Sequence, residues 1–226
     1  MKKMSVLMPL GLAAILLVAA GCNPVSKYND LISAYQGAQE AAANGQSCFA
    51  LTGNQISLQI SLYNSYLSTD VEKTKVYRDA LKSASDQLSA AQKAYTDSNG
   101  VAIPSNKLDL SQLAAQNATP AGLAGGLTLM VQAFTEAPLA AVDPSALINT
   151  QRIITEQYNQ AMSCVTDWNN AVRVYNTVRN QASGDIVGQV AQKLGVKDLP
   201  ESLPYFTPPA NSSNPFNVTA ATPVLP

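Results

Sequence analysis

The three cysteines are the residues of this sequence whose chemistry is easiest to define. The chain has 226 residues and contains Cys22, Cys48 and Cys164 but no histidine. Cys22 directly follows Ala19-Ala20-Gly21 at the end of an apolar run, residues 4–21. This order is typical of a bacterial lipobox, in which the thiol accepts diacylglycerol, a peptidase cleaves between Gly21 and Cys22, and the freed amino group is acylated, commonly with palmitate. The sequence therefore predicts that Cys22 is a lipidation site.

Residues 1–21 have the organisation of a signal peptide. Lys2 and Lys3 give a positive start, and an apolar run ending in small residues follows. The run is also long enough to remain as an uncleaved anchor, and a plain secretory signal would end similarly, so both alternatives stay open. Asn23 follows the cysteine, in place of the Asp that retains lipoproteins in the inner membrane. In a Gram-negative cell we therefore expect the periplasmic face of the outer membrane rather than the inner membrane.

Charge and composition exclude several classes of function. The net charge is −1, and without Lys2 and Lys3 the remaining chain has 12 basic and 15 acidic residues, a balance of −3. No run of Lys or Arg could neutralise phosphates, so nucleic-acid binding is not expected. The lack of histidine excludes a Ser-His-Asp arrangement and His-containing metal sites. We predict no enzymatic activity, no catalytic residue, no metal and no cofactor.

Cys48 and Cys164 are predicted to face each other across two helices. In heptad registers with Phe49 and Val165 at position a, both cysteines fall at position g, and g faces g across an antiparallel pair. Both also lie near the middle of their expected helices. An exported compartment permits a disulfide between them, which would stabilise the chain by roughly 3–5 kcal/mol. Two separate buried thiols are the alternative, whereas a catalytic cysteine would have no histidine to activate it.

Apolar periodicity predicts that these residues are held by helices. From Tyr28 onward, apolar and small residues recur three and four positions apart, which predicts a first helix from about residue 24 to 67. Residues 56–62 alternate with period two, so a strand is the alternative there. Thr69 and Glu72 have capping-box spacing and predict a second helix, which Asn99-Gly100 would end. The stripe of the first helix is Tyr28, Leu31, Tyr35, Ala38, Ala42, Gly45, Phe49, Thr52, Ile56, Gln59, Tyr63 and Tyr66, and that of the second is Tyr77, Leu81, Ala84, Leu88, Ala91 and Tyr95.

Two proline signals predict the later helices. Thr119-Pro120 indicates a third helix to about Glu136, and Asp143-Pro144 indicates a fourth to about residue 183. Residues 97–119 are expected to be irregular, and Gly184 is expected to end or kink the fourth helix before a short segment to about Leu194. The stripe of the fourth helix is Ile154, Tyr158, Ala161, Val165, Trp168, Val172 and Tyr175, continued by Arg179 and Ala182.

The predicted fold class is all-α, an elongated antiparallel four-helix bundle with two long helices and coiled-coil-like stripes. We expect the bundle to span residues 22–196. Residues 197–226 form a Pro-rich tail that is predicted to be extended or disordered. Within it, Pro204-Tyr205-Phe206 is expected to dock the start of the tail onto the bundle.

Several short motifs along these elements resemble the LemA family. Tyr28-Asn29-Asp30-Leu31-Ile32 is similar to the segment that follows the membrane anchor in that family. The pairs Tyr158-Asn159 and Tyr175-Asn176, the segment Glu136-Ala137-Pro138-Leu139 and the later Pro204-Tyr205-Phe206 resemble further motifs in order and approximate spacing. The family's Ala-Trp in the first helix is absent, and Phe49 lies nearby. The resemblance implies a membrane-anchored helical bundle and leaves the activity open, because the family has no established enzymatic function.

Together these patterns favour a non-enzymatic, lipid-anchored scaffold or interaction module of the bacterial cell envelope. Its expected partners are the membrane, through the acyl chains on Cys22, and a protein of the envelope, with a homo-oligomer left open. The alternative is a bundle that binds a small molecule or a lipid, with a cavity near Ala38, Ala42 and Gly45. An envelope hydrolase is the third candidate, and it has the least support from the sequence.

Overall fold

A computed structural model describes residues 24–64, 71–136 and 144–207, and these residues form an all-α structure. Its helices are α2 (Pro24–Asn64), α3 (Val71–Lys93), the 3₁₀ turn η1 (Ser105–Lys107), α4 (Leu110–Ala115), α5 (Pro120–Glu136), α6 (Pro144–Gln181) and α7 (Gly184–Leu194). No strand occurs among the described residues, and their one isolated β-bridge joins Thr96 to Ala102. The helix expected over residues 56–62 is therefore confirmed, because this stretch lies within α2.

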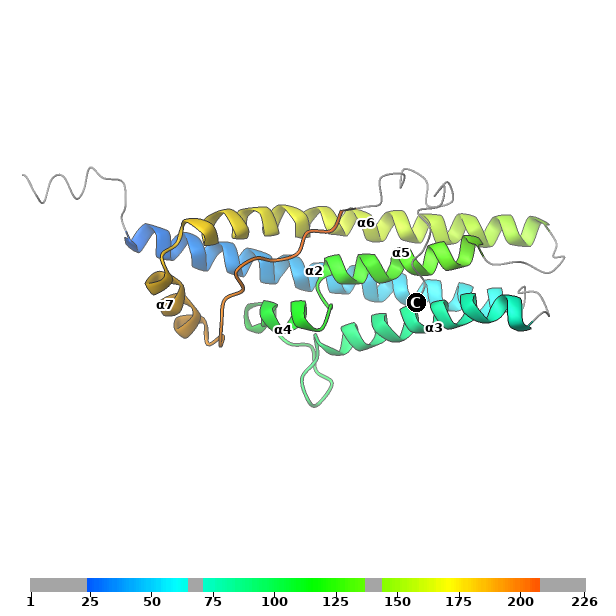
Figure 1. Cartoon of the computed structure of the whole chain (residues 1–226), viewed down its shortest axis with the longest axis horizontal. Coiled ribbons are helices and arrows are strands. Elements are labelled where there is room, and N and C mark those ends of the chain that lie inside the picture. The colour runs from blue at the N-terminus through cyan, green and yellow to red at the C-terminus, as the bar shows by residue number, and fades with distance from the viewer. Residues whose placement is uncertain (1–23, 65–70, 137–143, 208–226) are drawn as a thin grey trace, which may run out of the picture.

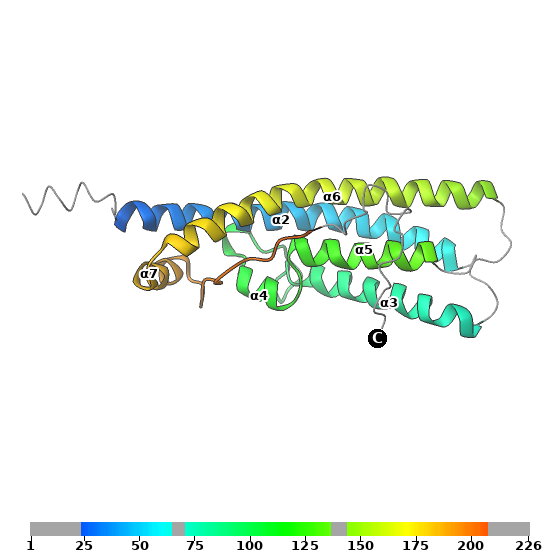
Figure 2. The ribbon, with the colours of Figure 1, turned by 45° about the horizontal axis from the view of Figure 1, so that its top comes forward.

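Two long helices run the length of the molecule (Figure 1). Helix α2 has 41 residues and α6 has 38, and they lie side by side in both views (Figures 1 and 2). Contacts along their length join them, among them Lys27 to Gln181, Tyr35 to Tyr175, and Cys48 to Cys164. The shorter helices α3 and α5 pack on each other, and α5 also contacts α6. Helix α7 lies at the end of the molecule where α2 begins (Figure 1).

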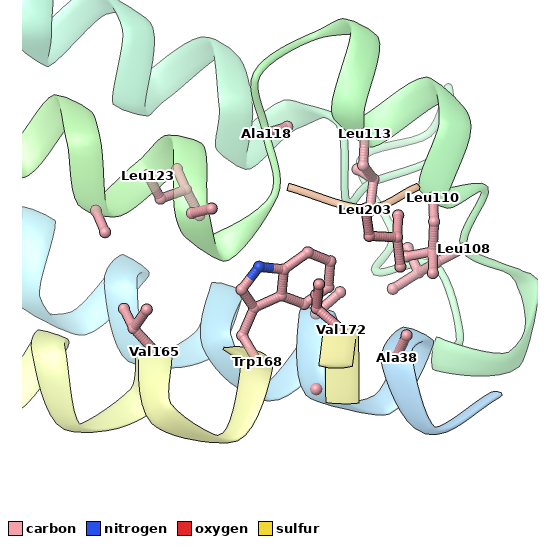
Figure 3. Close-up of a cluster of buried hydrophobic side chains, with 14 of the residues drawn as sticks. Ala38, Leu108, Leu110, Leu113, Ala118, Leu123, Val165, Trp168, Val172 and Leu203 are labelled. Atoms are coloured by element: carbon pink, nitrogen blue, oxygen red, sulfur yellow. The ribbon is translucent and has the colours of Figure 1, made fainter. Parts of the chain in front are cut away.

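The core follows the predicted stripe of the fourth helix. All seven of its apolar positions are buried, and each is at most 2% exposed: Ile154, Tyr158, Ala161, Val165, Trp168, Val172 and Tyr175. In the first helix, Leu31, Tyr35, Ala38, Ala42 and Phe49 are buried as predicted. The side chains of the stripe from residue 56 onward, and those of Tyr77, Leu81, Ala84 and Leu88, lie outside the described part. Figure 3 shows Trp168 at the centre of the core, among apolar side chains from several helices and from the C-terminal segment.

The second helix is shorter than predicted. It ends at Lys93 rather than at Asn99-Gly100, and the chain then turns back on itself. The carboxylate of Asp97 accepts hydrogen bonds from the backbone N–H groups of Asn99 and Val101, and Gly100 has a φ of +76°. An Asp that bonds to the backbone ahead of it competes with helix formation. This local turn explains why the helix does not continue.

Residues 97–119 are largely irregular as expected, but η1 and α4 interrupt them, so the expectation is wrong for residues 105–107 and 110–115. They contain α4, whose N-cap Asp109 accepts hydrogen bonds from the N–H groups of Ser111 and Gln112. Leu108, Leu110 and Leu113 of this segment are at most 2% exposed. A helix of six residues is too short to show a helical period, so its apolar residues could not be assigned to a core face from the sequence.

Candidate functional site

The lipobox residues Gly21 and Cys22 lie outside the described residues. The described chain begins with α2 at Pro24, so a single residue, Asn23, separates Cys22 from the first residue of the helix. At this end of the molecule, the Lys27 ammonium donates to Gln181 over 2.9 Å, and the Lys193 ammonium lies 5.3 Å from the ring centroid of Tyr28. These contacts join the start of α2 to the end of α6 and to α7.

Cys48 and Cys164 are brought together in the structure as a disulfide. Their Cα atoms are 6.6 Å apart, and 116 positions separate them in the sequence. Cys48 lies near the middle of α2, and Cys164 lies near the middle of α6. The bridge therefore links the two long helices at one point away from either end. A disulfide sulfur carries no thiol proton, so neither residue can act as a nucleophile in this state.

The small residues at which a ligand cavity was considered are packed instead. Ala38 and Ala42 are 0% exposed. A Cβ atom added to Gly45 would lie only 2.6 Å from Cγ of Pro120, the first residue of α5. Gly45 thus lets α5 approach the backbone of α2. This stripe therefore serves the packing of the helices.

The segment 197–207 runs alongside α6 as an extended strap (Figure 1). Two asparagines hold it by its backbone. Asn176 donates to the carbonyl oxygen of Leu203 over 3.1 Å and accepts from its N–H over 2.8 Å. Asn169 makes the same pair of bonds with Phe206, at 2.8 and 3.0 Å. Each side-chain amide thus satisfies both backbone groups of one strap residue, as a neighbouring strand would do.

Two aromatic side chains of α6 also hold the strap, and the Ser111 hydroxyl donates to the carbonyl oxygen of Asp198 over 2.8 Å. The Trp168 indole N–H donates to the carbonyl oxygen of Pro204 over 3.0 Å, and the Tyr175 hydroxyl donates to that of Pro200 over 2.6 Å. Leu199 and Leu203 are buried in the core, and Figure 3 shows Leu203 beside Leu110 and Leu113. The packed body therefore continues past residue 196. Prolines restrict the chain to extended conformations and donate no N–H, so they suit a segment bonded mainly through its carbonyl groups.

The four residues of α6 that hold the strap are not recognisable as a unit from the sequence. Trp168 and Tyr175 were assigned to the apolar core, which they also join, and Asn169 was not singled out. The pair Tyr175-Asn176 was noted only as part of a family resemblance, although both of its members hold the strap. An Asn seven residues from another, next to an aromatic residue in each case, is the one signal that could have indicated this attachment.

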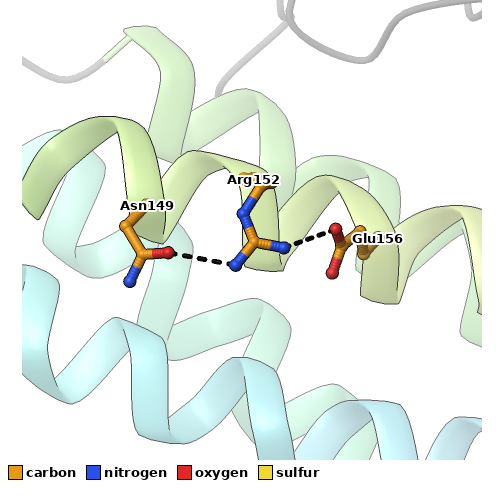
Figure 4. A network of polar contacts seen from close by, with 3 residues as sticks. All are labelled: Asn149, Arg152 and Glu156. Carbon is orange, nitrogen blue, oxygen red and sulfur yellow. Dashed lines mark hydrogen bonds and ion pairs between the residues drawn. The ribbon is translucent and has the colours of Figure 1, made fainter. Parts of the chain in front are cut away.

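The charged side chains on the helix surfaces pair locally. Arg152 on α6 donates to Glu156 over 2.6 Å and to Asn149 over 3.1 Å (Figure 4). Both members of the ion pair are 58% exposed, and such pairs stabilise a helix by roughly 0.3–0.5 kcal/mol. In the described part of the chain, no three or more Cys, Asp or Glu residues are grouped so that they could hold a metal ion.

Burial is the main influence on the tyrosines of the core. It raises the pKa of Tyr35 to about 12, although the Leu110 N–H that donates to its hydroxyl over 3.2 Å acts in the opposite direction. Burial also raises the pKa of Tyr95 and Tyr175. These hydroxyls are thus held neutral, as hydrogen-bonding groups of the core. None of the three is prepared to act as a base at neutral pH.

Comparison with models of known protein families, with curated proteins and with solved structures finds no match for this chain. Among the helices that the structure describes, none combines the length and the apolar character needed to cross a bilayer.

Proposed function

We propose that this protein is a lipoprotein of the bacterial cell envelope, anchored through acyl chains on Cys22, that acts as a non-enzymatic scaffold or interaction module. The observation that carries the proposal is Cys22 directly after Ala19-Ala20-Gly21 at the end of an apolar run, and α2 includes Pro24, two positions after this cysteine. One intervening residue is too short to act as a flexible tether. The folded body would therefore stand against the bilayer, and the outer membrane's periplasmic face remains our first choice.

The proposed architecture is an elongated antiparallel four-helix bundle of α2, α3, α5 and α6. Support comes from the contacts between the long helices, because Lys27, Tyr35 and Cys48 meet Gln181, Tyr175 and Cys164 in reverse order along α6. Membership of the LemA family, which the Tyr-Asn motifs suggest, would fit a bundle of this kind. The strap accounts for the second of these motifs, because Tyr175 and Asn176 both bind it.

The scaffold class is favoured over a bundle with a ligand in its core. The small residues Ala38, Ala42 and Gly45 are covered, and Pro120 occupies the space beside Gly45. Absence of histidine removes the commonest general base from the whole chain. An envelope protein that packs against the exposed helix faces is the expected partner.

A lipidation experiment tests this function. In the native host, the unaltered chain should be labelled by a fatty-acid analogue, should lose residues 1–21 and should sediment with membranes. Cys22→Ser should abolish labelling and cleavage at Gly21, because the modified thiol is absent. Cys48→Ser is the matched control, since it removes a cysteine that is not in the lipobox, and it should keep the label. An unlabelled, soluble wild-type protein would overturn the proposal.

A further inference from the structure

A pocket at the α7 end of the molecule has the properties of a ligand site. This pocket of about 490 Å³ lies between the end of α6, one face of α7 and the start of the strap. Ligand pockets in proteins commonly have volumes of roughly 300–1,000 Å³. The pocket is separate from the small residues of α2, at which the sequence had suggested a cavity.

Arg179 is the most buried of the charged side chains in the wall of this pocket. Its side chain is half-buried, its guanidinium interacts with the Tyr175 hydroxyl, and its Nε–H group is buried without an acceptor. Among the described residues, no carboxylate lies within ion-pair distance of its guanidinium. Arginine is rarely taken out of water without an anionic partner, because desolvation of the charge is costly. Arg179 therefore lacks the anion that its position calls for.

Part of the pocket wall is apolar. Ala191 and Leu199 are buried, Val187 and Val196 are partly buried, and all four line the pocket. Gly188 also lines it, and nothing lies within 4 Å of the position that a Cβ atom would take there. An apolar surface beside a half-buried cation that has no ion-pair partner suits a ligand with an apolar body and an anionic head.

We propose that this pocket binds a small amphiphilic anion, whose carboxylate or phosphate pairs with Arg179 and whose short apolar chain lies against Ala191 and Leu199. The inference goes beyond the proposed scaffold function and does not depend on lipidation of Cys22. Lys197 adds a second cation to the wall, whereas Asp198 and Glu201 add two carboxylates. Both carboxylates belong to exposed residues, so water screens their repulsion of the ligand.

Calorimetric titration of the full-length protein in lipid nanodiscs, with empty nanodiscs subtracted, tests this site. Octanoate and octyl phosphate are the two anionic probes, and octylammonium is the cationic control. We expect saturable binding of at least one anion and none of the cation. Binding of octanoate alone would show that the ligand is a carboxylate, and binding of octyl phosphate alone would show that it is a phosphate ester. Binding of both would show that the site selects the ligand by its negative charge and not by the type of head group.

Two variants, each with a matched control, test whether the ligand binds in this pocket. Arg179→Gln should weaken binding at least tenfold, whereas Arg173→Gln, at an exposed position of the same helix, should change it less than twofold. Gly188→Leu should fill the pocket and abolish binding without unfolding α7, because leucine has the higher helix propensity. Gly37→Leu, where a Cβ is equally free of neighbours, should bind as the wild type does.

Removing the two carboxylates of the pocket wall should have the opposite effect on affinity. The double change Asp198→Asn and Glu201→Gln should tighten binding, because it removes negative charge from the wall without altering its shape. Absence of anion binding, equal binding of octylammonium, or unchanged affinity in both Arg179→Gln and Gly188→Leu would each overturn the proposal. None of these outcomes would affect the lipidation experiment, so the two proposals can fail separately.

Discussion

Two glycines of α2 differ in whether the packing of the helices requires a glycine. A Cβ atom at Gly45 would meet Pro120 at 2.6 Å, whereas one at Gly37 would find nothing within 4 Å. A glycine costs roughly 1 kcal/mol of helix stability relative to alanine. That cost is offset at Gly45 by the close approach of α5. At Gly37 no contact of the described chain requires it.

We therefore predict opposite effects of two alanine substitutions. Gly45→Ala should destabilise the protein by about 1–3 kcal/mol, because α5 must shift away from α2 to relieve the overlap. Gly37→Ala should stabilise it by about 0.5–1 kcal/mol through helix propensity alone. Urea denaturation of both variants beside the wild type measures the two differences. Equal effects of the same sign would contradict the assigned packing role of Gly45.

Tyr35 gives a prediction for alkaline pH. Its pKa is about 12 in the folded chain and near 10 when unfolded, so the unfolded state loses its proton first as the pH rises. The contribution of the neutral hydroxyl to stability is therefore complete below pH 10 and is lost between about pH 10 and pH 12. The free energy of unfolding, measured by urea titration, should fall across this range.

Tyr35→Phe separates this effect from general alkaline denaturation. The variant should be less stable at neutral pH by about 1–2 kcal/mol, because the buried N–H of Leu110 loses its acceptor. Its stability should also fall less steeply than that of the wild type between pH 10 and pH 12. Parallel pH profiles of the two proteins would show that another group controls the transition.

At the scale of elements, the strap depends on side chains that lie far from it in the sequence. The amide of Asn176 satisfies both backbone groups of Leu203, 27 residues later. Asn176→Ala should leave these groups unpaired and cost about 1–3 kcal/mol. It should also raise hydrogen exchange and protease cleavage within residues 198–207. Asn180→Ala, at an exposed position one turn further on, is the control and should leave both measurements unchanged.

The disulfide gives a second prediction at this scale. Thiol labelling of the denatured, unreduced protein should find neither Cys48 nor Cys164 reactive. The double substitution Cys48→Ala and Cys164→Ala should lower the free energy of unfolding by about 3–5 kcal/mol, because a loop of more than a hundred residues is no longer closed in the unfolded chain. Two reactive thiols per chain in the unreduced wild type would contradict the bridge.

The elements that the sequence predicted well are those with long apolar periods or clear caps. Thr119-Pro120 opens α5, and the Thr119 hydroxyl accepts from the N–H of Gly122 over 3.4 Å. The stripe from Ile154 to Tyr175 is buried at every predicted position. Periodicity carries this information because each position repeats the same contact with the core.

The elements that could not be predicted depend on contacts without a period. Helix α4 is six residues long, and the strap is held by hydrogen bonds to side chains that lie far from it in the sequence. The pocket around Arg179 also joins three separate segments. No local pattern marks such a meeting point, because each member of it looks like an ordinary surface or core residue in its own segment.

At the scale of the whole molecule, the long helices set the dimensions. A helix of 41 residues is roughly 60 Å long at 1.5 Å per residue. A compact domain with the same number of residues as 23–207 would have a radius of gyration of about 16 Å. Small-angle scattering of that fragment should give a distinctly larger radius and a maximum dimension of at least about 60 Å. A radius near 16 Å would rule out the elongated shape.

The covalent link between Cys48 and Cys164 also limits how such a rod can move. Because it joins α2 and α6 near their midpoints, neither helix can slide along the other without breaking a bond. The two helices can splay apart at either end, but only about this fixed pivot. A force applied at the end of the molecule away from α7 would therefore tilt or bend α2 and α6 together. It would not make one helix slide along the other.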